Sequence, residues 1–536
     1  MTLSVLHEAD YVIVGAGSAG SFLASELAKD GKASVCVIEA GPMGRNPLLN
    51  VPLMTGVLLR SDGYTWQFKT EAQAALNGRQ ISWPRGKVVG GSGAINGMVW
   101  VRGLPSDYDG WAARGLNSWS WDQIRPVFDR VEGIPAAGGG QALGLEQPGW
   151  WTGLYDAFIA GAQHVGQPRC EDFNSETPEG VGRYRFNIRG GRRAHTGRLL
   201  KAAIAAGRVH AITEAHTLHL ELAQGRATGV AIRRGGQDHV VRARREVILC
   251  AGTVGSPGIL MRSGIGDPAV LGRAGVPVQV ANAGVGKGIQ DHLLIRVEHA
   301  ALKPGALNQL LRIDRAALAM AQALLFGTGP ASCFPLLTGG YFRSAPQEPL
   351  PDLQSHFMPA LSSATLRINP FRRPNGARVD DGFFANIFQM RPESRGTIAI
   401  ASPDPMAAPV IDPGYLSAER DREILRRGAR LLRRIFESPS FDGWRGAELA
   451  PGTARQSDAD LDAWIASSAE SVFHPTGGCC MGTGPDAVLD GQLRVRGVAG
   501  LRVADASVMP SVTSNNTNAP TVMIAARCAD FIREGL

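Results

Sequence analysis

Three glycines and a glutamate near the N-terminus have the types and spacing that bind a dinucleotide. Residues 10–20 read DYVIVGAGSAG, so Gly15, Gly17 and Gly20 form the pattern G-x-G-x-x-G directly after a short apolar run. The first glycine permits a tight turn, the second lets the backbone approach a pyrophosphate, and the third packs a helix against a strand. Glu39 follows 19 positions after Gly20, where an acid binds a ribose hydroxyl. The pattern predicts an adenine-dinucleotide site and leaves NAD and FAD open as its ligand.

His474 is the candidate for proton transfer. It lies in SVFHPTGGCCMG (471–482), where a proline and two glycines predict a tight turn that projects the ring into a cavity. The ordinary pKa of histidine lies near neutrality, which suits a group that takes up and releases a proton. We interpret the neighbouring Cys479 and Cys480 as small buried residues and not as a redox pair.

Alternating strand and helix patterns must position these residues. The apolar runs 11–14 and 34–41, and a third run that ends at Gly252, predict buried strands of an α/β fold. A final helix is expected to begin near Asn518, with a proline in its first turn. The cluster GGSG within 84–103 is too flexible for a helix or strand interior. It indicates either a mobile loop or a segment laid against a flat ring system, with Asn96 offering its amide.

Composition narrows the function classes. The chain has 536 residues, of which 44% are hydrophobic and 19% charged, which is typical of a large globular protein and excludes a disordered one. The net charge of +7 includes a basic run at 421–439, whose apolar residues recur at helical spacing. We interpret it as a helix with a solvated basic face, and we expect no nucleic-acid partner. Seven cysteines without zinc spacing, no basic leader and no membrane-length apolar stretch predict a cytoplasmic protein without a membrane span or metal.

These segments together resemble the glucose–methanol–choline (GMC) flavoprotein oxidoreductases. The resemblance covers the whole chain and leans toward the branch of choline and sorbose dehydrogenases and of aryl-alcohol or hydroxymethylfurfural oxidases. The matching segments are 86–109 (GKVVGGSGAINGMVWVRGLPSDYD), 252–266 (GTVGSPGILMRSGIG), 283–292 (AGVGKGIQDH), 351–359 (PDLQSHFMP), 391–400 (RPESRGTIAI) and 474–482 (HPTGGCCMG).

The resemblance implies two domains. A discontinuous Rossmann-like FAD-binding domain is expected from residues 1–155, 190–300 and 468–536. A second, antiparallel-sheet substrate-binding domain is expected from residues 156–189 and 301–467. The overall fold class is therefore α/β (α+β), and the oligomeric state is not predicted.

The resemblance also implies which residues hold FAD. They are Gly15, Gly17, Ser18, Ala19, Gly20, Glu39, Ala40, Trp66, Arg85, Val89, Gly90, Gly91, Ser92, Asn96, Gly97, Met98, Val99, Thr217, Gly252, Asp505, Ala506 and Thr517. Some members of the family attach the flavin through a histidine just before the position of Asn96. Ile95 stands there in this chain, so we expect FAD to be noncovalent.

The implied reaction is oxidation of an alcohol to an aldehyde or ketone. His474 matches the catalytic histidine and is expected to be the sole base, with a hydride passing to flavin N5. Its partner is expected to be Asn518 at the start of the final helix. The strand LQSHF places Gln354 and His356 on one face near the pocket, but we interpret His356, like His292, as structural. Electrons are expected to pass to a quinone or dye-type acceptor or to O2, with a slight preference for dehydrogenase activity.

Other activities stay open at this point. Some relatives keep FAD and cleave hydroxynitriles without redox chemistry, so a hydroxynitrile-lyase-type enzyme is the main alternative. A light-driven decarboxylase and a basic nucleic-acid-binding protein are weaker ones. The identity of the alcohol is not predicted, because no acid can be assigned to a choline ammonium group.

Overall fold

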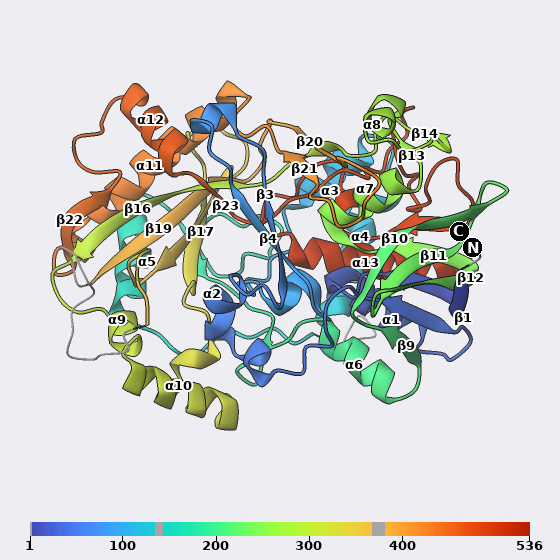
Figure 1. The fold of residues 1–536 in the computed structure, drawn as a ribbon. Coiled ribbons are helices and arrows are strands. Elements are labelled where there is room, and N and C mark those ends of the chain that lie inside the picture. Colours follow the sequence, from blue (N-terminus) through green and yellow to red (C-terminus); the bar gives the residue numbers. More distant parts are fainter. Residues whose placement is uncertain (1–2, 134–142, 367–380) are drawn as a thin grey trace.

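Two sheets organise residues 3–133, 143–366 and 381–536, the part of the chain that the computed structural model describes (Figure 1). Within it, seven strands form the first sheet, in the order β10-β11-β12-β1-β2-β9 with β24 also paired to β12. The strands are β1 (Ser4–Val14), β2 (Val35–Ile38), β9 (Val209–Ile212), β10 (Ala215–Ala223), β11 (Arg226–Arg234), β12 (Gln237–Leu249) and β24 (Leu501–Val503). Strands β24, β12, β1, β2 and β9 run parallel, as the expected Rossmann-like arrangement requires.

Helices cover this sheet because its central strands are apolar on both faces. Val12, Ile13 and the other residues of β1 from Tyr11 to Val14 are buried, as the short apolar run predicts. The packed helices are α1 (Ser18–Leu27), α4 (Trp121–Glu132), α6 (Gly197–Ala205), α7 (Gly252–Arg262) and α13 (Asn518–Arg533). Helix α13 begins at the predicted residue and lies against α1 and α4.

The second sheet is mostly antiparallel and, in the described residues, contains eight strands. Its order is β22-β16-β19-β18-β17-β6-β5, with β23 also paired to β16. The strands are β5 (Arg169–Cys170), β6 (Gly180–Arg183), β16 (Leu293–Ala301), β17 (Thr338–Phe342), β18 (Leu353–Met358), β19 (Gly382–Gln389), β22 (Arg445–Ala450) and β23 (Glu470–Ser471). Helices α5 (Gly153–His164) and α11 (Glu419–Glu437) pack against it. The mixed α/β class with a second antiparallel sheet is therefore confirmed.

The proposed division into domains stays a prediction, and two strands assigned to its FAD-binding pieces, β16 and β23, pair within the second sheet. Strand β16 was assigned to the FAD-binding piece that ends at residue 300, yet it pairs with β19 and β22 of the second sheet. Its pairing partners come from residues 382–389 and 445–450, which sequence patterning of the strand alone does not reveal. By this pairing, β16 is a strand of the second sheet.

The other strands of the described residues form four small sheets. They include the hairpin β3 (Thr65–Lys69)–β4 (Ser82–Gly86), the pair β7 (Ile188–Arg189)–β8 (Arg192–Arg193), the pair β13 (Ile265–Gly266)–β14 (Val280–Ala281), and the sheet β15 (Lys287–Ile289), β20 (Gly396–Ala399) and β21 (Val410–Asp412). The remaining helices are α2 (Thr55–Leu58), α3 (Pro105–Ala112), α8 (Pro268–Arg273), α9 (Ala306–Leu310), α10 (Ile313–Phe326) and α12 (Asp458–Ser468).

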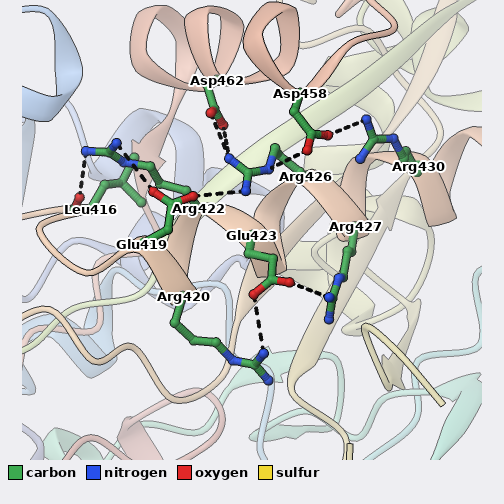
Figure 2. A network of polar contacts seen from close by, with 10 residues as sticks. All are labelled: Leu416, Glu419, Arg420, Arg422, Glu423, Arg426, Arg427, Arg430, Asp458 and Asp462. Atoms are coloured by element: carbon green, nitrogen blue, oxygen red, sulfur yellow. Dashed lines mark hydrogen bonds and ion pairs between the residues drawn. The ribbon is translucent and has the colours of Figure 1, made fainter. Parts of the chain in front are cut away.

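The basic run forms helix α11, but most of its arginines are paired with acids. Arg426 contacts Glu419 on its own helix at 3.0 Å and Asp462 on α12 at 2.7 Å, and Arg430 contacts Asp458 at 2.6 Å (Figure 2). The face expected to be basic and solvated therefore carries a network of both signs, with little unbalanced positive charge. Among the described residues, no helix has both the length and the apolar character needed to cross a bilayer.

Candidate active site

A cavity of about 690 Å³ runs from the first sheet to the second. Its walls include residues at the carboxyl ends of β1 and β2 (Val14, Ile38) and residues on β16 and β18 (Arg296, His356). Ligands of open α/β sheets bind at the carboxyl ends of the strands. This cavity is therefore where a dinucleotide and a substrate would meet.

The turn between β1 and α1 fits a pyrophosphate. Gly15 has a φ of +100°, and a Cβ there would lie 2.5 Å from the carbonyl oxygen of Cys250, so only glycine is accommodated. A Cβ on Gly17 would meet no atom closer than 3.9 Å, and it would extend into the space that a phosphate needs. No side chain caps the start of α1, so its first N–H groups are available to an anion.

Glu39 is held at the carboxyl end of β2. Its Oε2 accepts a hydrogen bond from the backbone N–H of Ala16, and its Oε1 accepts one from Gly41, both at 2.8 Å. Burial raises the pKa of this carboxyl, and the two N–H donors oppose that shift. Glu39 lines the cavity, and each oxygen retains a lone pair for a ribose hydroxyl.

Asp505 holds the start of α7 at the same cavity. Its Oδ2 accepts hydrogen bonds from the Gly252 N–H (2.8 Å) and the Ser256 hydroxyl (2.6 Å). Gly252 has a φ of +76° and open space around its missing side chain. The start of α7 is thus fixed while its glycine leaves room for a ligand.

The glycine-rich segment 85–99 packs closely against the β1–α1 turn. A Cβ on Gly91 would lie 2.6 Å from the Cα of Gly17, and one on Gly86 would lie 2.1 Å from the carbonyl carbon of Gly91. Asn96 folds onto its own loop, since its Oδ1 accepts from the Met98 N–H and from Arg193. The segment is therefore an ordered wall of the cavity and not a mobile loop.

Most residues predicted to bind FAD line this one cavity. They are Gly15, Gly17, Ser18, Ala19, Glu39, Ala40, Trp66, Arg85, Gly91, Ser92, Asn96, Gly97, Met98, Val99, Thr217, Gly252, Asp505, Ala506 and Thr517. Gly20, Val89 and Gly90 do not line it. Gly20 faces the Gly15 carbonyl oxygen, Val89 is part of the apolar core, and Gly90 lies against the His195 ring. These three residues support the cradle by packing.

A buried carboxylate fixes the turn that carries His474. Asp291 accepts a hydrogen bond from the backbone N–H of His474 at 2.8 Å through Oδ1, and its Oδ2 accepts from the hydroxyls of Ser471 and Tyr415. Arg85 donates to the carbonyl of Phe473 at 2.9 Å, one residue before His474. Burial raises the pKa of Asp291 to about 6, against the lowering effect of these donors.

A second histidine determines which nitrogen of His474 carries the proton. His292 Nε2 lies 2.9 Å from the carbonyl oxygen of Met390, which only accepts, so this nitrogen is protonated. In neutral His292, Nδ1 is then an acceptor, and it lies 3.0 Å from Nδ1 of His474. His474 must therefore carry its proton on Nδ1, and its Nε2 carries the lone pair of a base.

Burial keeps these histidines neutral. It lowers the pKa of His292 to about 4, and together with the nearby His292, His356 and Arg85 it holds the pKa of His474 well below the ordinary value. The tautomer assigned above is thus the state present at neutral pH.

The structure corrects the expected partner of His474. Asn516, in the loop before α13, has its amide nitrogen 3.1 Å from His474 Nε2. Asn518 instead accepts a hydrogen bond from the Ser18 hydroxyl at 2.8 Å. Asn518 is the first residue of α13 and faces α1, whereas Asn516 precedes the helix and faces the histidine.

Besides Asn516, two residues of this site were missed or given a structural role. His292 was interpreted as structural, although it bonds to His474, and its place beside Asp291 in the QDH segment was the available signal. Gln354 donates from Nε2 to Asn516 Oδ1 at 3.1 Å, which orients the asparagine amide. The strand pattern LQSHF had placed Gln354 near the pocket without this role.

A phosphate cradle that opens onto a neutral, hydrogen-bonded histidine in one cavity defines a dinucleotide-dependent redox enzyme. Two models of the family described as GMC oxidoreductase match residues 9–294 and 392–525. The chain belongs to the GMC oxidoreductase family, whose members bind FAD. It is an FAD-dependent alcohol oxidoreductase, and the hydroxynitrile-lyase alternative finds no support among its relatives.

Relatives match almost the full chain. Oxygen-dependent choline dehydrogenase 1 from Chromohalobacter salexigens is 40% identical over 540 residues, with 98% of this chain and 95% of the relative covered. Oxygen-dependent choline dehydrogenase from Rhizobium etli is 38% identical over 535 residues, with the same shares covered. The crystal structure of pyridoxine 4-oxidase from Mesorbium loti superposes with a TM-score of 0.87 at 32% identity, covering 98% of this chain and 99% of that one.

Proposed function

We propose that His474 Nε2 is the base that takes the hydroxyl proton of the substrate alcohol. The observation that carries this proposal is the hydrogen-bond chain from the Met390 carbonyl through His292, which leaves the lone pair of His474 on Nε2. FAD, when bound, supplies the acceptor for the hydride that leaves the carbinol carbon. Proton and hydride together convert the alcohol to an aldehyde or ketone.

In this step Asn516 positions the substrate and does not act as a base. An amide does not accept a proton at neutral pH, but its N–H2 group lies against Nε2, where the substrate oxygen must approach. Gln354 holds the amide oxygen from the other side, so the nitrogen remains turned toward His474. In this proposal Asn516 orients the alcohol oxygen toward the base.

The side chains around the cradle support noncovalent FAD. The position from which some family members attach the flavin is occupied by Ile95, which is buried and lines the cavity. Acid precipitation should therefore release the flavin into the supernatant, and flavin in the protein pellet would contradict a noncovalent cofactor. A cytoplasmic location and a quinone or dye-type acceptor in preference to O2 also belong to the proposal.

An anaerobic titration with alcohols tests the reaction. The panel contains benzylic, furanic, sugar, polyol and aliphatic alcohols, together with choline because relatives are named choline dehydrogenases. Loss of the oxidised-flavin absorbance with at least one alcohol is the expected result, and the speed of its return in air separates oxidase from dehydrogenase. A flavin that none of them reduces would contradict the proposal.

A histidine variant tests the base. His474→Ala should slow flavin reduction by roughly 10²- to 10⁴-fold, the usual contribution of general-base catalysis, without loss of FAD. His239→Ala, at an exposed hydrogen bond to Ser4, serves as the matched control and should leave the rate unchanged. A near-normal rate in His474→Ala would show that another group is the base.

A further inference from the structure

Three strands of the second sheet bring a row of hydrogen-bond donors to the cavity. Arg296 on β16 is paired with Asn386 on β19, and Asn386 is paired with His356 on β18. All three line the cavity, and we call them the donor row. The next row toward the base contains Leu294, Phe388 and Gln354, two residues further along each strand.

The hydrogen-bond chain at the base also determines the state of His356. Because His474 Nε2 is an acceptor, Asn516 must present its amide nitrogen to it and its oxygen to Gln354. Gln354 then presents its amide nitrogen to both neighbours, and its second hydrogen goes to His356 Nε2 at 3.1 Å. His356 must therefore carry its own proton on Nδ1.

Each member of the donor row retains a donor for which the described residues offer no acceptor. His356 has its Nδ1–H. Asn386 accepts from Arg296 Nε at 3.0 Å through Oδ1, so its amide N–H2 is left over. Arg296 donates from Nη2 to Glu470 at 3.3 Å and retains Nη1. His356 and Asn386 are both buried, so their donors depend on a ligand or water in the cavity.

The charge of this row is nearly balanced, which bears on the class of ligand. Glu470 is half-exposed and offsets the charge of Arg296, so neither sign of charge is strongly favoured by Coulomb attraction. What remains is the set of donors, which requires an acceptor. A trimethylammonium group has no lone pair and would leave the two buried donors unsatisfied.

We propose that the donor row recognises a hydrogen-bond acceptor, the oxygen of a carboxylate or of a neutral carbonyl, at the end of the substrate remote from its carbinol group. The inference rests on the proposed function, since the carbinol is placed by His474 and Asn516. Two residues along a strand span about 7 Å, which is the spacing between the donor row and the row of Gln354, the residue that contacts Asn516. The proposal therefore places the acceptor at a distance on the order of 7 Å from the carbinol. An alcohol with a rigid ring between the two groups meets this requirement, and choline does not.

Kinetics with four probes test the inference. They are benzyl alcohol, 4-(hydroxymethyl)benzamide, 4-(hydroxymethyl)benzoate and choline. We expect kcat/KM to be at least tenfold higher for the amide or the carboxylate than for benzyl alcohol, with choline lowest. Whichever of the amide and the carboxylate has the higher kcat/KM shows whether the row prefers a neutral or an anionic acceptor. Either result supports the inference.

Variants then assign the preference to the row. Asn386→Ala should reduce the ratio of kcat/KM for the better acceptor probe to that for benzyl alcohol at least fivefold. Arg296→Met, at a partly exposed site, provides the same test if the first variant retains no FAD. Leu294→Ala, in the neighbouring apolar row, is the matched control and should leave the ratio unchanged.

The outcomes separate the two proposals. Oxidation of benzyl alcohol without a preference for either acceptor probe, or a higher kcat/KM for choline, overturns the inference and leaves the proposed function standing. If the ratio of kcat/KM for the better acceptor probe to that for benzyl alcohol is unchanged in both Asn386→Ala and Arg296→Met, the inference is also overturned. Failure of every alcohol to reduce the flavin refutes the proposed function and the inference together.

Discussion

Replacing His292 by leucine tests whether this residue sets the tautomer of His474. Leucine removes the Nδ1 acceptor, which leaves the His474 Nδ1–H buried without a partner. An unsatisfied buried donor costs about 1–3 kcal/mol. The ring avoids this cost by moving its proton to Nε2, where the Asn516 amide can turn its oxygen toward it. The lone pair of the base then faces away from the substrate.

The expected loss of rate follows from this free energy. Because about 1.4 kcal/mol corresponds to a factor of ten, the cost predicts a decrease of about 5- to 150-fold in the anaerobic rate of flavin reduction. Stopped-flow reduction with the best alcohol of the panel measures it. FAD content, measured on the same preparations, shows whether the cradle is intact.

A glutamine at the same position serves as the matched control. Its amide oxygen can accept from His474 Nδ1–H while its N–H2 donates to the Met390 carbonyl, so His292→Gln should recover most of the rate. A His292→Leu enzyme that holds FAD and reduces it within twofold of the unaltered rate would refute the tautomer argument. Equal losses in both variants would point to packing around the ring.

Further predictions concern the cradle, the asparagine pair and pH. Gly17→Ala should lower FAD retention at least tenfold while the apoprotein folds normally, because the added methyl meets no protein atom within 3.8 Å and extends into the phosphate space; retention by ultrafiltration measures it. Asn516→Ala should slow flavin reduction at least tenfold more than Asn518→Ala, and the reverse order in stopped-flow would restore the sequence-based assignment. The lowered pKa of His474 means that the deprotonated base persists to acid pH, so activity is lost only as pH falls below 6.5. A kcat/KM profile from pH 5 to 9 with an acid midpoint above 6.5 would contradict this.

The cofactor cradle was predictable because its constraints are local in the chain. Gly15 and Gly17 must be glycine for the backbone to turn and approach a ligand, and Glu39 follows at the end of the next strand. Each of these residues is constrained by a strand and a helix that are adjacent in the chain, so their spacing in the sequence reveals the constraint directly. The turn around His474 could be predicted from the sequence for the same reason.

The pairing around the base was not predictable, because it depends on helix phase and on distant strands. Asn516 and Asn518 differ by two positions, and only the first residue of α13 decides which one faces His474. His292 lies 182 residues from His474, and the pairing of β16 with β23 brings the two together. No pattern in either segment alone contains this information.

A neutral histidine in place of a carboxylate has a chemical consequence for this site. A carboxylate beside His474 Nδ1 would fix the same tautomer, but it would also raise the pKa of the ring by favouring its protonated form. His292 donates from Nε2 to the Met390 carbonyl and accepts at Nδ1 from His474, so it fixes the tautomer and adds no negative charge. Asp291 accepts a hydrogen bond from the backbone N–H of His474 and thus positions the residue through its main chain. The site therefore orients His474 without placing a negative charge beside its ring. His474 stays deprotonated and can accept the alcohol proton.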